Sequence, residues 1–523
     1  MLNELGTLDQ VNNIVIVGGG SAGWIVASTL INDHPNKKIT LIESQQLGNI
    51  TVGESTVNDI NPWLDHLGIN RVDFLRNTDG VYKYATGFTN FYSENSETFF
   101  THFGMPISDG TANGPLDWFV KKALYPETKP QDYFESNIPQ SSLVLNNRML
   151  DTYMDEMAPF QPSYDVAYQV NGLKLGSWLG ESYAKPRGVI HIEGKIVKVN
   201  GDDSGVTSLL LEDGSEITAD LFVDCSGFKS MLLGEFLGED FNPTKYRLPH
   251  NKAYFAPIEY TDKEKELQLF TNCYGLKNGW AWNTPLWSRI GSGYTYSDEF
   301  IDDDAALQEF KDHLNSKNML VYDPHRSEKM NFRLISAKNG YYDRVFVKNV
   351  FAIGLSAGFL DPLEGSGLYH VQSMSTALSH VILKEKINLI DKAAVNEFWR
   401  HEINATMKFI ETHFIHTTRN DSEYWIKTRN KIFTPEHALA LSNDYRANNF
   451  STYGVVYTAV AAGMNVSPIN KFKMKQILYG LNLDLESIVN NNLPIIENKK
   501  KSWKAVAENL PTHFEYLKKN IHY

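Results

Sequence analysis

A glycine-rich turn between two short apolar runs constrains the fold of this chain most strongly. Residues 13–17 read NIVIV, a β-branched run typical of a strand that is covered on both faces. The motif G-x-G-x-x-G follows at 18–23, residues 22–31 predict a helix, and residues 39–42 predict a second strand. This order of elements predicts a βαβ unit within a parallel sheet.

The residue types of this turn indicate a dinucleotide site. Gly18 permits a tight turn, Gly20 lets the backbone approach a pyrophosphate, and Gly23 allows close helix packing. The helix N-terminus adds N–H groups that bind the anion. Glu43, 20 positions after Gly23, would accept a hydrogen bond from a ribose hydroxyl and repel a 2′-phosphate, which favours FAD or NAD over NADP. The alternative is a glycine-rich turn in an α/β fold that binds no nucleotide.

Two later segments are expected to join the same sheet. Residues 219–223 and 350–353 are apolar runs, and each leads into a glycine-bearing turn. Residues 245–300 are rich in aromatic and β-branched residues between turn signals, which predicts an inserted antiparallel sheet. Residues 138–147, with a proline and several Ser and Asn, are expected to form a loop.

The C-terminal part is expected to be mostly helical from about residue 393 onward. Apolar side chains recur there at spacings of three and four, which predicts one buried helical stripe; these are Trp399, Ile403, Met407, Ile410 and Phe414. His413 and His416 lie on the same segment, but no carboxylate and histidine set at ligand spacing accompanies them. We therefore expect packing for these histidines and no metal site.

Charge and cysteine content exclude several other classes. The formal net charge of −13 disfavours nucleic acid as a partner. Two cysteines, Cys225 and Cys273, cannot form a disulfide framework, and the acidic N-terminal residues do not resemble a secretory signal, so we expect a cytoplasmic protein. Residues 14–31 are uncharged, but glycines interrupt them, so we expect a strand and a helix and no membrane span.

Several separated motifs together resemble the flavin-dependent halogenases, best known from the tryptophan halogenases, over nearly the whole chain. They are GGGSAGW at 18–24, VGEST at 52–56, YK at 82–83, DLFVDCSGF at 220–228, GWAWNTPL at 279–286, GLSAGFLDPLEGSGLY at 354–369 and TRNDSEYW at 418–425. Two departures from the family pattern occur. Thr284 stands where the family has isoleucine, and Gly365 and Ser366 stand where it has serine and threonine.

The resemblance implies an α/β fold with an FAD-binding Rossmann-like (GR2-type) sheet, an inserted antiparallel sheet and a mostly helical C-terminal region. We expect a discontinuous FAD-binding module that comprises residues 10–90, 165–235 and 340–390. The inserted substrate-side sheet and loops are expected at 91–164 and 236–339, and a helical substrate-side region at 391–523. The resemblance also implies flavin contacts beyond the glycines and Glu43, at Ser21, Ala22, Gly53, Glu54, Ser55, Ile196, Gly227, Leu355, Ser366, Gly367 and Leu368.

Lys83 matches the catalytic lysine of the family, and Glu364 matches its partner glutamate. Taken alone, Lys83 would be a solvated surface lysine and Glu364 a helix-start or surface carboxylate. Lys83, however, lies among aromatic residues where an ammonium is costly to bury; these are Tyr82, Tyr84, Phe88 and Phe91. It could hold an electrophilic halogen as a covalent haloamine or as hydrogen-bonded hypohalous acid, and the sequence leaves both open. Glu364 would stabilise the cationic ring intermediate and take its proton.

Two further features concern the halide and the flavin. Gly365 and Gly367 allow a nest of N–H groups, and the resemblance places halide contacts at Ser366 and Gly367. Trp280 and Trp282 would share one face of a strand. Core packing is their simplest role, whereas the resemblance places them beside the flavin, where they keep the organic substrate away from it.

The implied reaction is halogenation of a small electron-rich aromatic compound, of indole or phenol type, with FAD, O₂ and halide. No second G-x-G-x-x-G follows a strand, so a separate flavin reductase is expected to supply reduced FAD. Residues 450–464 lack the glutamate and adjacent aromatics with which the family clamps tryptophan, although Thr101, His102 and Phe103 keep part of an aromatic wall. Free tryptophan is therefore not expected as the substrate.

Several alternatives stay open from the sequence. A single-component flavin hydroxylase or a flavin reductase could use the same fold, and so could a flavoprotein without catalytic activity. The choice among chloride, bromide and iodide, the position halogenated and the oligomeric state, with a homodimer as one alternative, also stay open.

Overall fold

The apolar run at 13–17 forms β1 (Asn13–Val17), a central strand of a mostly parallel sheet. It pairs in parallel with β2 (Lys38–Glu43) and with β12 (Leu221–Asp224), and β12 pairs in parallel with β21 (Val350–Ala352). The prediction that these segments share one sheet is confirmed. Because parallel strands end at the same edge, the turns after β1, β12 and β21 are neighbours in space.

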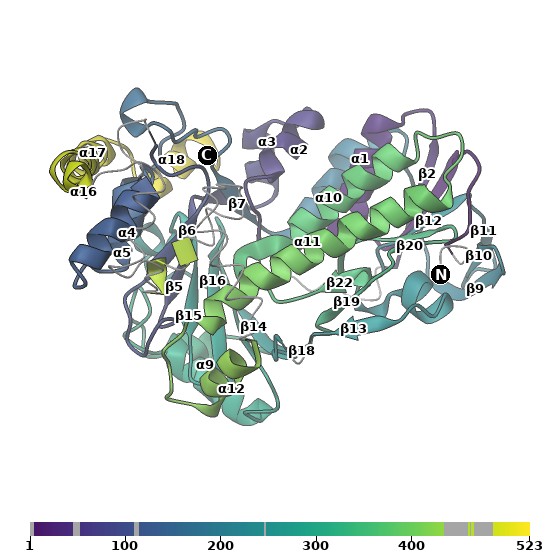
Figure 1. Cartoon of the computed structure of the whole chain (residues 1–523). Helices are drawn as coiled ribbons and strands as arrows, with labels where there is room; N and C mark the ends of the chain where they lie inside the picture. Colours follow the sequence, from purple (N-terminus) through teal and green to yellow (C-terminus); the bar gives the residue numbers. More distant parts are fainter. Residues whose placement is uncertain are drawn as a thin grey trace. The chain divides into compact units, whose positions relative to one another are not determined.

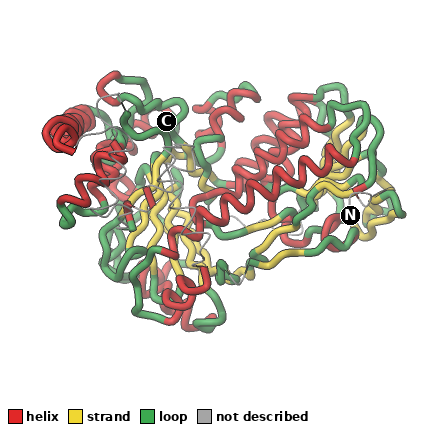
Figure 2. The backbone as a smooth tube through the Cα atoms, in the orientation of Figure 1, coloured by secondary structure: helices red, strands yellow, loops and turns green. Residues whose placement is uncertain are grey.

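The computed structural model describes residues 5–44, 53–108, 114–244, 247–432, 459–460, 462–464 and 485–523. The chain divides into two compact units, which we call unit 1 (Met1–Gly80, Val170–Asn251 and Ser336–Met407) and unit 2 (Val81–Gln169, Lys252–Ile335 and Lys408–Tyr523). Figure 1 labels the elements along the chain, and Figure 2 shows the mixture of helices and strands.

Unit 1 is built around a six-stranded sheet in the order β20-β21-β12-β1-β2-β8. The helix α1 (Ser21–Asp33) packs against α10 (Ser366–Val381), as Figure 1 shows. The other elements of this unit are β3 (Glu54–Ser55), α2 (Ile60–His66), α3 (Arg71–Asn77), α7 (Gly172–Trp178), β8 (Ile190–Glu193), β9 (Ile196–Asp202), β10 (Gly205–Leu211), β11 (Glu216–Ile217), β13 (Phe241–Pro243), β19 (Gly340–Tyr342), β20 (Phe346–Val347) and β22 (Gly358–Phe359).

Unit 2 contains a seven-stranded sheet in the order β18-β14-β17-β16-β15-β5-β6. Its strands from 252 to 296 run antiparallel, which confirms the predicted inserted sheet, while β15 pairs with β5 in parallel. The strands of unit 2, of which β4 and β7 lie outside the seven-stranded sheet, are β4 (Val81–Lys83), β5 (Ala85–Thr89), β6 (Phe99–His102), β7 (Ala167–Val170), β14 (Lys252–Ile258), β15 (Phe270–Gly275), β16 (Gly279–Pro285), β17 (Ile290–Tyr296) and β18 (Arg333–Ser336).

The helices of unit 2 correct one prediction. Residues 138–147 do not form a loop throughout, because Ser141–Leu145 is the helix α6. The serines and asparagines of this stretch are typical of a loop, but the side chains of Leu143 and Val144 are buried and hold the helix against the core. The other helices are α4 (Gly114–Leu124), α5 (Gln131–Asn137), α8 (Lys263–Glu266), α9 (Asp303–Leu314), α12 (Glu423–Ile432), α16 (Leu485–Ser487), α17 (Leu493–Glu508) and α18 (His513–Asn520).

The predicted apolar stripe lies on a long helix, α11 (Leu389–Ile415). All five of its members are buried, which confirms the prediction for this segment: Trp399, Ile403, Met407, Ile410 and Phe414. Most of the predicted substrate segment 450–464 lies outside the described residues. Within the described ranges, none of the helices combines the length and the apolar character that crossing a membrane requires.

Candidate active site

The first glycine turn of unit 1 is packed too closely for a side chain at two of its positions. Gly18 has φ +114°, and a Cβ atom there would lie 2.2 Å from the carbonyl oxygen of Cys225. A Cβ atom on Gly23 would lie 1.9 Å from the carbonyl oxygen of Gly18. Such distances are far inside van der Waals contact, so both positions require glycine for the turn and the helix to meet.

Gly20 differs, because an added Cβ would meet nothing within 4 Å. It is the N-cap of α1, whose first turn carries no acidic residue and whose N-terminus receives no side-chain hydrogen bond. The backbone N–H groups there are therefore available to an anionic ligand. Open space at Gly20 beside closed space at Gly18 and Gly23 is the shape that a dinucleotide pyrophosphate requires, so the residues present fit FAD.

The carboxylate of Glu43 lies directly against this turn. A Cβ atom on Gly19 would lie 1.9 Å from Glu43 Oε2, so the middle glycine of the sequence GGG makes room for that side chain. Glu43 Oε1 is 2.7 Å from His191 Nε2, and the His191 ring lies 5.3 Å from that of Trp24. His191 lies on β8, far along the chain, and no motif marks it, so the sequence did not reveal this partner.

A buried carboxylate organises the turn after β12. Asp224 accepts hydrogen bonds from the backbone N–H groups of Ser226, Leu232 and Leu233 at 2.7–3.0 Å. Burial raises the pKa of Asp224 above its ordinary value. The hydroxyl of Ser356, in the turn after β21, donates to the carbonyl oxygen of Asp224. The turns that follow β12 and β21 are thereby joined.

The turn around Glu364 has an unusual backbone. Glu364 has φ 67° and Gly365 has φ 71°, so two successive left-handed residues precede α10. A Cβ atom on Gly365 would lie 2.7 Å from the carbonyl oxygen of Ser55, whereas one on Gly367 would meet nothing within 4 Å. The structure thus brings the GEST and LEGSG segments together within unit 1. The left-handed conformation of Glu364 costs on the order of 1–3 kcal/mol, so the surrounding structure must hold it.

A buried pair holds the start of this turn. Asp361 Oδ1 accepts a hydrogen bond from the N–H of Leu363 at 3.1 Å, and Asp361 Oδ2 lies 2.7 Å from His250 Nδ1. The side chains of His250 and Asp361 are 1% and 0% exposed. The motif at 354–369 contains Asp361, but His250 has no sequence signal and was missed. This pair fixes the backbone immediately before Glu364.

The other expected flavin residues of unit 1 lie in different settings. The Ser21 hydroxyl donates to the carbonyl oxygen of Gly172 at 3.0 Å, and burial raises the pKa of Glu54. Leu355 is 42% exposed, and Ile196 begins β9 in a separate three-stranded sheet. The remaining members are a helical residue, two glycines at positive φ and a buried leucine: Ala22, Gly53, Gly227 and Leu368.

In unit 2, Lys83 is fully buried. It ends β4, where it pairs with Ala167 of β7, and its exposed fraction is 0%. Its Nζ lies 5.3 Å from the centroid of the Phe103 ring. An ammonium over an aromatic face is attracted by the ring, by about 2 kcal/mol when water is excluded. The aromatic residues that the sequence places near Lys83 are also buried: Tyr82, Tyr84, Phe88 and Phe91.

The two tryptophans of unit 2 lie side by side on β16. The Trp280 and Trp282 ring centroids are 5.6 Å apart, and the residues are 1% and 8% exposed. Gly293 pairs with Trp282 across β16 and β17, and a Cβ atom there would lie 2.2 Å from the Trp282 ring. A glycine inside a strand signals such a close approach, and the run GSGY at 291–294 carries that signal.

The histidine singled out on the long helix packs among aromatic rings. His413 lies 4.6 Å from the Phe88 ring and 5.2 Å from the Phe409 ring, between ring centroids, and its Nδ1 lies 3.1 Å from the Phe409 carbonyl oxygen. Over the part of the chain that the structure describes, no three His, Cys, Asp or Glu side chains are grouped so as to hold a metal ion. Lys83 and Glu364 belong to different units, and their pairing stays a prediction.

Comparison with known proteins gives consistent likenesses. A family model described as "Tryptophan halogenase" matches residues 13–475. Tryptophan 6-halogenase ThaL of Streptomyces albogriseolus is 26% identical, over 98% of this chain and 98% of that protein. The structure titled "VirX1 apo structure" is similar with a TM-score of 0.86 and 30% identity, over 98% of this chain and 99% of the other.

A further solved structure supports the fold. Xcc4156, a flavin-dependent halogenase from Xanthomonas campestris, has a TM-score of 0.83 and 23% identity, over 98% of this chain and 99% of the other. These likenesses confirm the predicted α/β fold with an FAD-binding Rossmann-like sheet.

Proposed function

Because this chain belongs to the tryptophan halogenase family of flavin-dependent enzymes, we propose that it halogenates an electron-rich aromatic compound of indole or phenol type through Lys83. The single observation that carries the proposal is the complete burial of the Lys83 side chain beside the Phe103 ring. Burying an ammonium is costly, so a lysine in this position requires compensating contacts or a chemical task.

Unit 1 provides the proposed flavin site. The open Gly20 position and the uncapped N-terminus of α1 would receive the pyrophosphate, and Glu43, oriented by His191, would accept from a ribose hydroxyl. Bound in reduced form, FAD supplies the electrons with which O₂ converts halide into hypohalous acid. We propose a separate flavin reductase as its source, because the chain has one G-x-G-x-x-G unit and no second one after a strand.

Lys83 would hold the oxidised halogen against the substrate. Its N–H groups can donate to hypohalous acid, or its amine can displace water from that acid and carry the halogen covalently. In either form the halogen transfers to the ring carbon, and the ring loses a proton. We propose that the Glu364 carboxylate stabilises the cationic ring and accepts this proton. The Asp361–His250 pair would fix the turn that carries Glu364.

Trp280 and Trp282 would form a wall that keeps the organic substrate from the flavin. An arene that reached the flavin would be open to direct hydroxylation, so separation decides the product. Substrate recognition would involve Phe103, and we expect a ligand other than free tryptophan. The halide would bind at the N–H groups of Ser366 and Gly367, where the structure leaves open space at Gly367. A cytoplasmic location fits this reductase-dependent reaction.

The test is a product analysis of the whole protein. Purified protein is incubated with FAD, a flavin reductase, NADH and O₂, with chloride, bromide or iodide in turn, and a panel of indoles and phenols is analysed by mass spectrometry. We expect halogenated products only when both reductase and halide are present. Hydroxylated product and NADH consumption without the reductase would instead identify a single-component flavin hydroxylase.

A further inference from the structure

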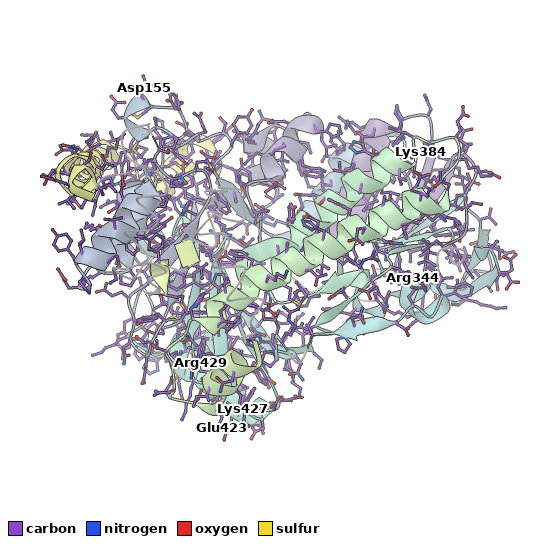
Figure 3. The ribbon with its side chains drawn as sticks, viewed as in Figure 1. Asp155, Arg344, Lys384, Glu423, Lys427 and Arg429 are labelled. Atoms are coloured by element: carbon purple, nitrogen blue, oxygen red, sulfur yellow. The ribbon has the colours of Figure 1, made fainter. Side chains whose placement is uncertain are left out.

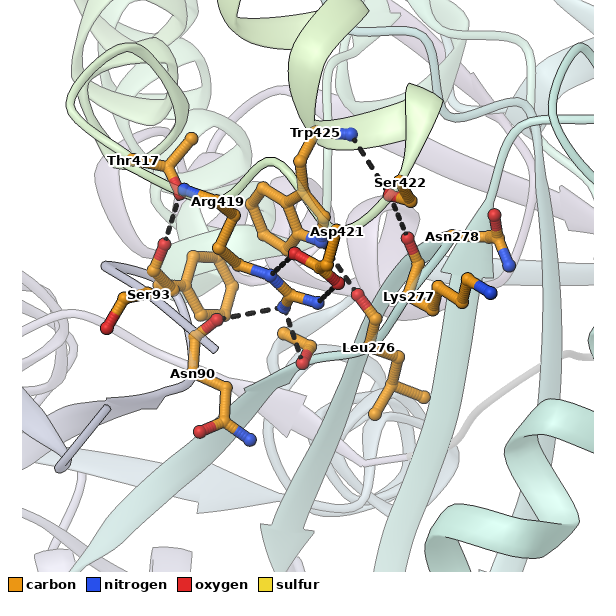
Figure 4. Close-up of polar contacts among 12 residues, drawn as sticks. Asn90, Ser93, Leu276, Lys277, Asn278, Thr417, Arg419, Asp421, Ser422 and Trp425 are labelled. Atoms are coloured by element: carbon orange, nitrogen blue, oxygen red, sulfur yellow. Dashed lines mark hydrogen bonds and ion pairs between the residues drawn. The ribbon is translucent and has the colours of Figure 1, made fainter. Parts of the chain in front are cut away.

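The segment TRNDSEYW at 418–425 has no role in the reaction described above, yet it makes an ordered set of contacts within unit 2. Three of its side chains donate hydrogen bonds to three consecutive carbonyl oxygens at the end of β15 and in the turn that leads to β16 (Figure 4). These bonds are Arg419 Nη1 to Gly275 at 2.8 Å, Trp425 Nε1 to Leu276 at 2.8 Å and Ser422 Oγ to Lys277 at 2.6 Å. We call these three residues the hairpin clamp.

Arg419 is the centre of the clamp. Its side chain is 4% exposed and forms a two-bond ion pair with Asp421 at 2.9 and 2.6 Å. The guanidinium Nη1 also donates to the carbonyl oxygen of Asn90, just after β5, at 2.9 Å, and the group lies 4.4 Å from the Trp425 ring centroid. The Arg419 guanidinium holds the pKa of the Asp421 carboxyl below its ordinary value. A buried charge with this many partners fixes the ends of β5 and β15 in one geometry.

The clamped turn sets the register of the strand that bears both tryptophans. Gly275 is the cross-strand partner of Trp280, and Cys273 is the partner of Trp282. A slip of one residue in this hairpin would turn both tryptophans to the opposite face of the sheet. From the other side, Glu309 on α9 accepts from the N–H of Lys277 at 2.7 Å. The hairpin clamp on one side and α9 on the other therefore both hold this turn.

Aromatic contacts also connect the clamp to the tryptophans, through the ring of Phe91. The Trp425 ring lies 5.7 Å from the Phe91 ring, which lies 6.5 Å from the Trp280 ring, and Trp280 lies 5.6 Å from Trp282, all between centroids. The backbone of Phe91 is itself held, because its carbonyl oxygen accepts from the Thr417 hydroxyl at 2.7 Å. Hydrogen bonds and ring packing thus act on the same hairpin.

We propose that Arg419, Ser422 and Trp425 are positioning residues that fix the register of the β15–β16 hairpin and thereby the placement of Trp280 and Trp282. The consequence for the reaction rests on the proposed function, in which these tryptophans separate substrate from flavin. Loosening the clamp would let oxidised halogen or substrate leave its path, so that O₂ and reduced flavin are consumed without halogenated product.

The first experiment measures the hairpin itself and does not depend on activity. Arg419→Lys keeps the charge, but a single ammonium cannot reproduce the guanidinium's bonds. Amide hydrogen exchange, read by mass spectrometry on peptides covering 275–285, is expected to speed up about tenfold or more in this variant. The matched control is Arg344→Lys in unit 1. Arg344, which is labelled in Figure 3, forms a two-bond pair with Glu239 at 2.7 and 2.8 Å, and the substitution breaks that pair. Exchange in 275–285 should not change in the control.

A milder variant keeps the test valid if Arg419→Lys does not fold. Trp425→Phe keeps an aromatic ring but removes the N–H that bonds to Leu276 together with part of the buried indole, and Trp503→Phe is the control for the loss of buried ring. Faster exchange confined to the hairpin in Trp425→Phe supports the clamp. Unchanged exchange there, or an equal rise over all of unit 2, overturns it.

The second experiment measures coupling, as halogenated product formed per O₂ consumed. Under the proposal, Arg419→Lys and Trp425→Phe lower this ratio several-fold, while the rate of reduced-flavin oxidation stays near that of the parent protein. A parent protein that yields no halogenated product would contradict the proposed function, and the exchange result would still decide the clamp. Normal coupling together with a loosened hairpin would overturn the link between clamp and reaction.

Discussion

The proposed sites in the two units of this enzyme differ in whether backbone or side chains form them. In unit 1 the proposed flavin site depends largely on the backbone: Gly18 and Gly23 leave no room for a methyl group, whereas Gly20 leaves open space at the end of a helix. In unit 2 the proposed catalytic site is made of side chains, with Lys83 against Phe103 and Trp280 against Trp282. One added carbon atom at the glycine turn of unit 1 should therefore be damaging, whereas the surroundings of Lys83 and the tryptophans in unit 2 should be most sensitive to removed rings or altered charge.

The largest effect on folding is expected for Gly18→Ala. The new Cβ would lie 2.2 Å from the Cys225 carbonyl oxygen at a φ of +114°, so strain and collision act together. We expect a loss of more than about 3 kcal/mol in the free energy of unfolding, measured by urea titration of the protein without flavin. Stability within about 0.5 kcal/mol of the parent would show that the turn is not packed as described.

A second prediction tests the sensitivity of unit 2 to charge. Burial lowers the pKa of His313 from 6.5 to about 4, and its ring lies 4.7 Å from that of Tyr274. Above pH 6.5 neither the folded nor the unfolded state binds the proton, so the full stability is present. As the pH falls towards 4, the unfolded state binds a proton that the folded state excludes, and stability is lost.

Between pH 7 and pH 5 this loss amounts to about 2 kcal/mol for one such histidine. Urea unfolding at both pH values should show that His313→Gln lacks this component of the pH dependence. The exposed His325 is the control, because Glu328 raises its pKa, so His325→Gln should not remove the loss. An unchanged pH dependence in His313→Gln would mean that this ring is not held neutral in the fold.

The smallest effect is expected for Gly20→Ala, the counterpart of Gly18→Ala on the same turn. An added Cβ meets no atom within 4 Å, so the free energy of unfolding without flavin should change little. The methyl group would occupy the space through which the backbone approaches a pyrophosphate, so FAD affinity should fall about tenfold, or about 1.4 kcal/mol. Flavin fluorescence titration measures this, and unaltered affinity would place the pyrophosphate elsewhere.

The same contrast explains which parts of the molecule could be predicted from sequence. The strand at 13–17 and its glycine turn are local patterns with a local cause, and the structure confirms them. The helix Ser141–Leu145 was missed because the serines and asparagines on either side of its two buried apolar side chains are typical of a loop. Strand β12 was expected from residue 219 and begins at Leu221, a shift that periodicity alone does not resolve.

Site residues that depend on distant contacts had no local signal. His191 joins Glu43 only because β8 runs beside β2, and His250 meets Asp361 only in the folded chain. Lys83 was located through the family resemblance and not through its spacing. Its burial is a fact of tertiary packing, set by strands β4 and β7. Two of the groups that Arg419 binds are backbone carbonyls, which carry no sequence pattern.

The central claim is that halide is oxidised at the flavin of unit 1 and reaches the substrate only through Lys83 of unit 2. The most direct measurement compares Lys83→Ala with the parent protein, with FAD, a reductase, O₂ and halide supplied, and with a soluble trap for hypohalous acid present. The account predicts that the variant still consumes O₂ and halogenates the trap, while halogenation of the aromatic substrate falls by at least about 100-fold. Substrate halogenation at the parent rate in Lys83→Ala would contradict the claim.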